Sequence, residues 1–374
     1  MHVLVAPDKF KGSLTGREVA QNVAAGLRAI LPGLDVVELP VADGGDGTVD
    51  AALAAGHRWV PARAEGPTGE PVDTGYAERN GVAVVELADV SGLRRLPGGR
   101  LAPLTASSYG TGEVLRAALE AGCTSAVLGV GGSASTDGGA GLVQALGARL
   151  LDAAGTELRR GGAALVRLDR LDLSALHPGV GQVPVVVACD VDNPLLGARG
   201  AAAVYGPQKG ASAEQVDRLD AALARWADVV ARDVGIDVAD QPGAGAAGGV
   251  GYAALAVLGA TLRSGVELVL DLVGFAEHLP GASLVITGEG SLDEQTLNGK
   301  APAGVGAAAR SSGVPVVAVA GRSLLSAEDL ELAGIRQAYA LTDIEPDPHR
   351  SMTEAGPLVR RLARQVAVDW LGAR

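Results

Sequence analysis

The chain contains four lysines, and each lies next to or near a glycine in a segment that we predict to be a loop. The other 27 of its 31 basic residues are arginines. The ammonium group of lysine is a compact charge with three mobile donors, which suits contact with a migrating phosphoryl group. Ordinary solvated lysines are the alternative, but their confinement to such loops favours phosphate binding. The candidates are Lys9, Lys11, Lys209 and Lys300.

Carboxylates follow several of the predicted strands. In open α/β sheets, ligands bind beyond the carboxyl ends of the strands. Carboxylates there can hold Mg²⁺ together with phosphate oxygens, or accept the proton of an attacking hydroxyl. Any single one could instead begin a turn or cap a helix, but their recurrence favours a site. The set is Asp8, Asp43, Asp46, Asp190, Asp192, Glu289 and Asp293.

A glycine-rich segment, residues 131–139, lies between a predicted strand and a predicted helix. It has four glycines, more than a tight structural turn needs, with hydroxyls and small residues between them. Backbone N–H groups at such a helix start can bind a phosphate or another anion. We therefore expect Gly131, Gly132, Ser133 and Ala134 to supply donors to an anionic group.

Both ends of the chain show the strand–loop–helix alternation of a parallel, doubly wound sheet. Thr15 and Glu18 form a capping box that predicts a helix ending near Leu31. A further strand is predicted near Arg58–Ala62. The strands predicted to form this sheet also include His2–Ala6, Asp35–Leu39, Ser283–Thr287, Val314–Ala320 and Ile335–Leu341. The fold class is therefore α/β.

The middle of the chain has a different pattern. Asn80-Gly81 between two apolar runs predicts a β-hairpin, and Ser212 with Gln215 caps a long helix. Hairpins mixed with helices indicate a mixed sheet. We expect residues 1–68 and 283–374 to form one doubly wound domain, with residues 69–282 inserted as a mixed α/β domain. The cleft between the domains is then the default ligand site.

The composition of the 374 residues excludes several classes of protein. With 48% hydrophobic and 20% charged residues the chain is not disordered. Its net charge of −12 argues against nucleic acid or an anionic membrane as partner. Cys123 and Cys189 cannot form a disulfide framework, and we expect both thiols to be buried. No signal peptide or convincing membrane span is present, so we expect a cytoplasmic protein.

Four familiar sequence patterns do not fit this chain. Residues 243–248 match G-x-G-x-x-G, but Gln241-Pro242 stands where a dinucleotide fingerprint needs a strand. Close packing or another nucleotide contact is more plausible there. A Walker A sequence is absent, the five histidines show no ligand spacing, and Ser133 is not in a G-x-S-x-G elbow.

Taken in order, these loops resemble the type I glycerate kinase family. The resemblance runs from residue 3 to about residue 325. The matching motifs are Ala6–Leu14, Pro40–Thr48, Tyr109–Glu113, Gly131–Gly141, Cys189–Gly197, Tyr205–Ala211, Pro242–Gly249 and Ile286–Gly290, followed by Asp293, Gln295 and Gly299-Lys300. Two departures occur. Asp46 stands where we expect Glu, and Ser291-Leu292 stands where many members have Arg-Ile, which removes a cation near the presumed site.

The resemblance implies ATP-dependent phosphorylation of D-glycerate, most readily at the 2-hydroxyl, within glyoxylate and glycerate metabolism. It also implies a flavodoxin-like domain that is split around an inserted α/β domain, in agreement with the organisation expected above. From the carboxylates we expect Mg²⁺ as cofactor, and we expect the protein to be a monomer or a homodimer. Two other functions stay open: a kinase of another small hydroxy acid, or one forming 3-phosphoglycerate, and a non-catalytic protein that binds a metabolite in its cleft.

Site roles follow from the matching motifs. Asp190 or Asp293 is expected to accept the glycerate hydroxyl proton, with Lys9 and Lys11 completing the catalytic set. Asp190, Glu289 and Asp293 are the expected metal ligands, with Asp190 the first choice. Besides the glycine loop, the expected substrate- and phosphate-binding residues are Asp8, Asp43, Asp192, Asn193, Gln208, Lys209, Gly288, Glu289 and Lys300.

Overall fold

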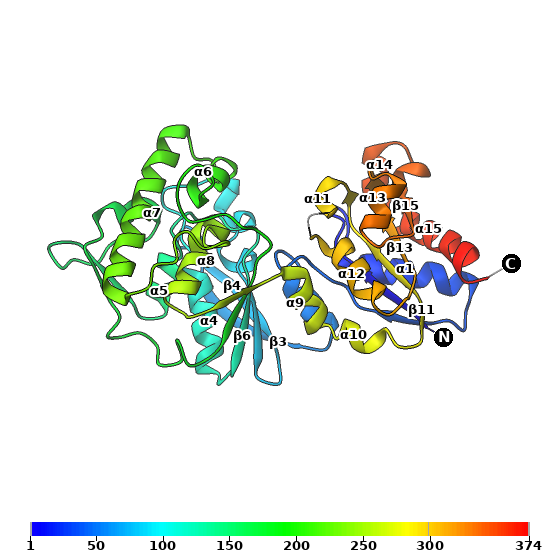
Figure 1. Cartoon of the computed structure of the whole chain (residues 1–374), viewed down its shortest axis with the longest axis horizontal. Coiled ribbons are helices and arrows are strands. Elements are labelled where there is room, and N and C mark those ends of the chain that lie inside the picture. Colours follow the sequence, from blue (N-terminus) through cyan, green and yellow to red (C-terminus); the bar gives the residue numbers. More distant parts are fainter. Residues whose placement is uncertain (1, 298, 373–374) are drawn as a thin grey trace. The chain divides into compact units, whose positions relative to one another are not determined.

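The computed structural model of the chain describes residues 2–297 and 299–372. They form two compact units, coloured along the sequence in Figure 1. Unit 1 is made of Met1–Asp43, Asp50–Gly56 and Ser264–Arg374, and unit 2 of Gly44–Val49 and His57–Arg263. Both ends of the chain therefore contribute to unit 1.

Unit 1 is built on a five-stranded parallel sheet, as predicted. Its order is β15-β13-β11-β1-β2. Counted along the chain within this unit, that is the doubly wound order 2-1-3-4-5, in which the strand order reverses between β1 and β11. The strands are β1 His2–Pro7, β2 Asp35–Glu38, β11 Ala282–Gly288, β13 Val316–Ala320 and β15 Gln337–Ala340.

Helices cover both faces of this sheet because alternate residues of β1 point to opposite sides. Val3 and Val5 pack into an apolar cluster with α1 (Gly16–Ile30) and α15 (Ala355–Trp370). Leu4 and Ala6 pack into a second cluster. The helices of that second cluster are α9 (Gly265–Leu272) and α12 (Ala301–Arg310).

Unit 2 contains a six-stranded mixed sheet in the order β10-β9-β6-β5-β4-β3, which confirms the predicted mixed sheet. Strands β3 to β5 are antiparallel, and β5, β6, β9 and β10 are parallel. The hairpin turn has φ values of +53° at Asn80 and +82° at Gly81, as a type I′ turn requires. The strands are β3 Arg58–Glu65, β4 Pro71–Arg79, β5 Val82–Glu86, β6 Ser125–Gly129, β9 Val185–Ala188 and β10 Thr261–Arg263.

Strand β3 does not join the parallel sheet of the chain ends. It pairs with β4 in antiparallel register from Arg58↔Glu78 to Glu65↔Pro71. The chain passes between the two units at residues 43–44, 49–50, 56–57 and 263–264, whereas the sequence predicts domain boundaries at 68–69 and 282–283. The sequence of a strand does not by itself identify the strand with which it pairs, so only the observed pairing with β4 assigns β3 to its sheet.

The predicted helix caps are present. Capping boxes start α1 at Thr15, α7 (Ala213–Val234) at Ser212 and α13 (Ala327–Leu332) at Ser326. In residues 2–297 and 299–372 we find no helix with the length and apolar character to cross a membrane. Cys123 is buried as expected, but Cys189 is only half-buried, with Sγ 3.3 Å from the carbonyl of Val191.

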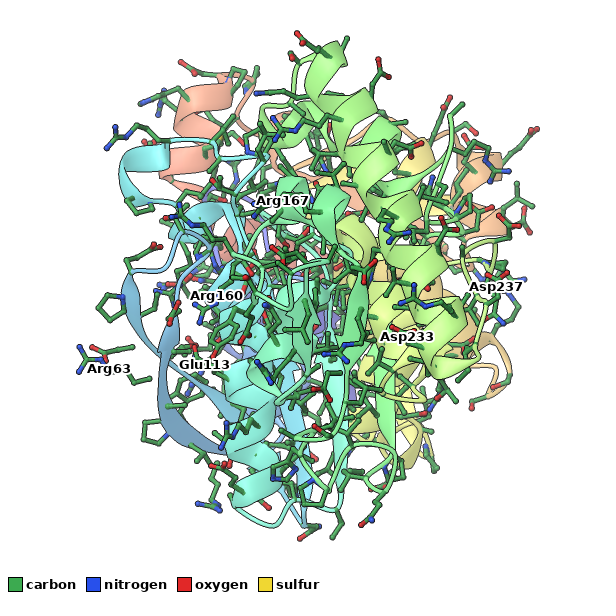
Figure 2. All side chains as sticks on the ribbon, turned by 90° about the vertical axis from the view of Figure 1, so that its left-hand side faces the viewer. Arg63, Glu113, Arg160, Arg167, Asp233 and Asp237 are labelled. Atoms are coloured by element: carbon green, nitrogen blue, oxygen red, sulfur yellow. The ribbon has the colours of Figure 1, made fainter. Side chains whose placement is uncertain are left out.

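The motif Tyr109–Glu113 serves packing within unit 2. It begins α4 (Tyr109–Glu120), where a Cβ atom on Gly110 would lie 1.8 Å from the carbonyl oxygen of Glu65. Glu113 accepts a hydrogen bond of 2.7 Å from the backbone N–H of Glu65. Arg160 pairs with the Glu65 carboxylate and lies over the Tyr109 ring; Figure 2 labels Glu113 and Arg160 on this face. Here glycine is required by close approach to the backbone.

Candidate functional site

In unit 1, several of the predicted residues gather beyond the carboxyl ends of β1 and β11, where the strand order reverses. Asp8 follows β1, and its N–H donates 2.8 Å to the carbonyl of Gly288 at the end of β11. Asp8 is buried, and its carboxylate accepts from the N–H of Lys9 at 2.6 Å, with Lys9 Nζ at 3.5 Å. Gly288 cannot carry a side chain, because a Cβ atom would lie 2.0 Å from the carbonyl of Val319.

The pKa of Asp8 reflects its burial and the charged side chains near it. The pKa of Asp8 is raised to about 7, chiefly by burial; Lys9 opposes this rise, and the carboxylates of Asp43 and Glu289 contribute to it. Asp43 and Glu289 therefore each lie close enough to Asp8 to repel its negative charge. A buried carboxylate with two like charges near it is suited to hold a proton.

A second cluster follows β11. Lys300 Nζ lies 3.6 Å from Glu289 Oε2 and 3.8 Å from Asp293 Oδ1. The hydroxyl of Thr296 donates to Glu289, and the hydroxyl of Ser291 donates 3.1 Å to Asp293 Oδ2. Burial raises the pKa of Glu289, and Asp293 adds to this, while Thr296 and Lys300 act in the opposite direction.

The loop of Lys11 packs against this second cluster. A Cβ atom on Gly290 would lie 3.2 Å from the backbone nitrogen of Lys11. Lys11 itself is exposed. The structure thus brings together, within unit 1, a large part of the residues predicted from sequence. They are Asp8, Lys9, Lys11, Asp43, Gly288, Glu289, Asp293 and Lys300.

In unit 2, the glycine loop has an internal carboxylate at its helix start. Asp137 is fully buried and accepts hydrogen bonds from the N–H groups of Gly139 and Gly141, at 3.2 and 3.3 Å. Ser107 and Ser108 donate to the same carboxylate. The donors of this helix start are therefore used by the chain's own carboxylate. Anion binding by the earlier part of the loop stays a prediction.

Lys209 lies against that earlier part of the loop. Its ammonium group donates 2.7 Å to Ser133 Oγ and also donates to the carbonyl of Ser135. Burial lowers the pKa of Lys209 to about 7, opposed by Asp137. Ser135 Oγ and Thr136 Oγ1 are fully buried and have no hydrogen-bond partner in the part of the chain that the structure describes.

The other three residues predicted to bind an anion, Gly131, Gly132 and Ala134, lie close to neighbouring backbone segments of unit 2. The N–H of Ala134 donates 3.0 Å to the carbonyl of Ser91, and the carbonyl of Gly132 accepts from Leu93. A Cβ atom on Gly131 would lie 2.7 Å from Gly45 Cα. The two backbones must therefore approach closely, which explains these small residues.

The remaining predicted residues of unit 2 follow β9 or stand near Lys209. Asp190 is exposed directly after the strand, and Gln208 is exposed beside Lys209. Asp192 pairs with Arg199 at 3.0 Å on the surface. Asn193 supports its loop, because its Nδ2 donates 2.8 Å to the carbonyl of Arg199 and its Oδ1 accepts from Tyr205 at 2.5 Å.

Sequence reasoning missed two charged groups of unit 2. One is Asp137, which the motif contained but did not distinguish from the other loop residues. The other is Glu86, a buried carboxylate at the end of β5 that accepts from the N–H groups of Gly47 and Val49 at 3.1 and 3.2 Å. The sequence did contain a signal for Glu86: it is a charged residue within the apolar run of residues 82–87, where a buried and paired carboxylate is expected.

Arg94 pairs with Glu86 and also contacts the carboxylates of Asp46 and Asp89. Asp46, which departs from the family's Glu, thus takes part in an ion-pair network. Burial raises the pKa of Glu86 to about 8, Asp89 and Asp46 add to this, and Arg94 opposes them. This network fixes the segment Gly44–Val49 in unit 2.

The G-x-G-x-x-G segment is a packing element, which agrees with one of the two expected roles. Gly248 (φ +72°) lies in the left-handed, non-helical start of α8 (Ala246–Ala256), ahead of the regular part of the helix. A Cβ atom there would lie 2.1 Å from the carbonyl of Ser135 and 2.8 Å from Lys209 Nζ. The segment therefore closes over the glycine loop.

The oxygens of unit 1 fit a magnesium ion that is shared with a substrate. Among residues 2–297 and 299–372, no group of three or more His, Cys, Asp or Glu side chains could hold a metal by itself. Mg²⁺ often takes only one or two carboxylates, with waters and phosphate oxygens completing its shell. Glu289 and Asp293 offer two such carboxylates, both within 4 Å of Lys300 Nζ.

Comparison with known proteins gives a consistent result. A model of the glycerate kinase family matches residues 3–371. A glycerate kinase of Bacillus subtilis (strain 168) is 42% identical over 372 residues, which are 99% of this chain and 97% of the relative. A glycerate 2-kinase of Escherichia coli (strain K12) is 46% identical over 328 residues, or 86% and 85% of the two chains. A crystal structure assigned to glycerate kinase 2 of Salmonella typhimurium LT2 matches with a TM-score of 0.87 at 43% identity, covering 100% of this chain and 98% of that one.

Proposed function

Because the chain belongs to the glycerate kinase family and is a kinase, we propose that it phosphorylates D-glycerate with ATP at the 2-hydroxyl, giving 2-phosphoglycerate and ADP. The name of the Escherichia coli relative, glycerate 2-kinase, supports the choice of hydroxyl. The observation that carries the proposal is the group of Asp8, Glu289, Asp293 and Lys300 beyond β1 and β11. Carboxylates and a lysine at a switch point are the groups that phosphoryl transfer requires.

Phosphoryl transfer depends mostly on positioning and on neutralising charge. We assign the cationic role in unit 1 to Lys9, Lys11 and Lys300, which would contact the phosphate of the nucleotide or the carboxylate of glycerate. Mg²⁺, bound with the nucleotide, would neutralise charge on the phosphate oxygens. Glu289 and Asp293, and in unit 2 Asp190, are the carboxylates that would hold it.

A carboxylate must also receive the proton of the glycerate hydroxyl as the new bond to phosphorus forms. Asp190 and Asp293 are the two candidates. Asp293 is oriented by three hydrogen bonds, from the hydroxyl of Ser291, from the N–H of Gln295, and from its own N–H to Thr296 Oγ1. Asp190 stands directly after β9.

The first test is to incubate the protein with D-glycerate, ATP and Mg²⁺ and to identify the product by ³¹P NMR or by coupling to enolase. We expect 2-phosphoglycerate. Formation of 3-phosphoglycerate would keep the kinase and reverse the pose of the substrate. The absence of a phosphorylated product, together with a melting temperature that rises with glycerate, would favour a binding protein.

The proton acceptor and the metal ligands can be separated with Asp190→Asn and Asp293→Asn. Loss of a metal ligand raises the Mg²⁺ concentration needed for half-maximal activity, so added Mg²⁺ restores part of the rate. Loss of the proton acceptor lowers kcat at every Mg²⁺ concentration. Asp35→Asn, an exposed carboxylate at the amino end of β2, is the matched control.

A further inference from the structure

A cation that we did not predict stands beside the Glu289–Lys300 cluster. Beyond β11 and β13 the chain forms a short parallel pair, β12 (Ser291–Leu292) and β14 (Arg322–Ser323). In this pair Ser291 lies opposite Arg322. Arg322 therefore comes directly after β13, on the loop adjacent to the one that carries Asp293.

The side chain of Arg322 is joined to the cluster by hydrogen bonds. Its Nε donates 3.0 Å to Ser291 Oγ, and Ser291 Oγ donates 3.1 Å to Asp293 Oδ2. On the other side, Asp293 Oδ1 lies 3.8 Å from Lys300 Nζ. Two cationic side chains thus approach the same carboxylate, one directly and one through a serine hydroxyl.

The backbone holds Arg322 in this position. The N–H of Arg322 donates a hydrogen bond of 3.2 Å to the carbonyl oxygen of Gly290. The N–H of Gly321 donates one of 3.2 Å to the carbonyl oxygen of Glu289. The approach is so close that a Cβ atom on Gly321 would lie 2.4 Å from Gly290 O. A residue fixed on both sides by backbone hydrogen bonds loses little entropy when it binds a ligand.

The charge of Arg322 has no carboxylate partner among the residues that the structure describes. No Asp or Glu oxygen in the described parts of the chain lies within ion-pair distance of it, whereas Lys9 and Lys300 both pair with carboxylates. Its side chain is exposed, and the bond to Ser291 uses only Nε. The two terminal amino groups of a guanidinium form a planar fork that matches the two oxygens of a carboxylate or phosphate.

We propose that Arg322 is a further substrate-binding residue, which holds an oxyanion, either a phosphate of the nucleotide or the carboxylate of the hydroxy acid, through the terminal amino groups of its guanidinium. The proposal rests on the proposed function for the identity of these substrates. It also changes one expectation from sequence. Ser291 removes a cation from one strand of the pair, but Arg322 supplies one from the strand beside it.

The test uses Arg322→Ser and the exchange variant Ser291→Arg/Arg322→Ser. Because the two residues lie opposite each other, the exchange moves the guanidinium across the pair while keeping it near Asp293. Arg336→Ser, an exposed arginine before β15 at the opposite end of the sheet, is the control. For each variant, kcat and the KM values of ATP and D-glycerate are measured. The shifts in melting temperature with ADP and with D-glycerate are measured separately.

We expect Arg322→Ser to raise the KM of one substrate about 10- to 100-fold, as loss of a charge-assisted hydrogen bond implies. A rise for ATP identifies phosphate as the oxyanion, and a rise for D-glycerate identifies the carboxylate. The melting-temperature shift of the same ligand should shrink, and the melting temperature without ligand should not change. The exchange variant should recover most of the binding.

Two results would overturn the proposal. In one, Arg322→Ser keeps the KM values and both ligand-induced shifts of the native chain. In the other, it lowers the melting temperature without ligand and the exchange variant does not recover, which indicates a structural role. If the native chain does not phosphorylate glycerate, the proposed function fails, yet the shifts with ADP and D-glycerate still decide whether Arg322 binds either anion.

Discussion

The ammonium group of Lys209 donates a 2.7 Å hydrogen bond to Ser133 Oγ, a residue 76 positions earlier in the chain. The lysine is only 1% exposed, so this bond is made away from water. A second bond to the carbonyl of Ser135 connects it to the same loop. Lys209 is therefore a buried lysine whose hydrogen bonds hold the glycine loop in place within unit 2.

This burial gives Lys209 a distinctive effect on stability. The pKa of Lys209 is lowered to about 7 when folded, against 10.5 for an unperturbed lysine. Between pH 7 and pH 10.5 the unfolded chain binds a proton at Lys209 that the folded chain does not, so the free energy of unfolding rises with pH.

Relative to Lys209→Met, the free energy of unfolding of the native chain should therefore rise by up to about 4 kcal/mol between pH 7 and pH 10. Urea denaturation across this range checks the slope, with Lys11→Met, at an exposed position, as the control. If the free energies of unfolding of the native chain and of Lys209→Met changed with pH in parallel, the prediction would be contradicted.

Asp8 should show the opposite slope. Its pKa is raised from 3.8 to about 7 by burial, so between these values the folded chain holds a proton that the unfolded chain has released. The free energy of unfolding then falls as the pH rises from about 4 to 7. Asp8→Asn should be more stable than the native chain at pH 7.5, by up to about 4 kcal/mol, while losing activity. Thermal melts at pH 5 and pH 7.5 measure this, with Asp35→Asn as the control. A destabilised Asp8→Asn at pH 7.5 would show that the carboxylate is ionised at little cost.

Single substitutions of Lys9, Lys11 and Lys300 by Met test the charge argument for phosphoryl transfer. Loss of a phosphate contact at the transition state should cost about 3–4 kcal/mol in kcat/KM, comparable to the loss of an oxyanion-hole donor. Arg310→Met, at the far end of the same helix as Lys300, is the control for removing a cation. Near-native kcat in all three lysine variants would rule the argument out.

Glu86 should be needed to hold Gly44–Val49. Glu86→Ala leaves two backbone N–H groups and Arg94 without their carboxylate, which should cost about 2–4 kcal/mol of unfolding free energy. Glu86→Gln keeps an oxygen for the N–H groups and should cost less. Denaturant titrations give the order, and limited proteolysis within residues 44–49 reports the local effect. If the two variants lost the same free energy of unfolding, the negative charge of Glu86, and not its hydrogen-bond acceptor, would be the source of the stabilisation.

Local sequence signals predicted the helix starts and the hairpin of this chain. The Thr15–Glu18 and Ser212–Gln215 pairs satisfy their own helix donors, and Asn80-Gly81 adopts the positive φ values that its turn needs. These features depend on residues within a few positions of one another, so they can be read without the tertiary structure. The loops after β1 and β11 were predictable for a related reason, because parallel strands align their carboxyl ends.

Other features depend on partners distant in sequence. Asp137 fills a helix start with an internal carboxylate, which a glycine-rich motif cannot distinguish from a start that is open to a ligand. The position of Arg322 opposite Ser291 follows from the pairing of β12 with β14, each only two residues long. Such pairs are too short for a periodic pattern. The roles assigned to the site residues stay predictions until the variants are measured.

The place of β1 inside its sheet, between β2 and β11, has a consequence for the newly made chain. β1 pairs with β2 on one side and β11 on the other, so one of its edges has no partner until residue 282 has been synthesised. At about 5–20 residues per second, that delay is on the order of ten seconds or more. During it the apolar run of residues 3–6 is available for pairing with another chain. Residues 57–263, made in the meantime, can complete their own sheet first, so the earliest part of the chain to emerge is among the last to become buried.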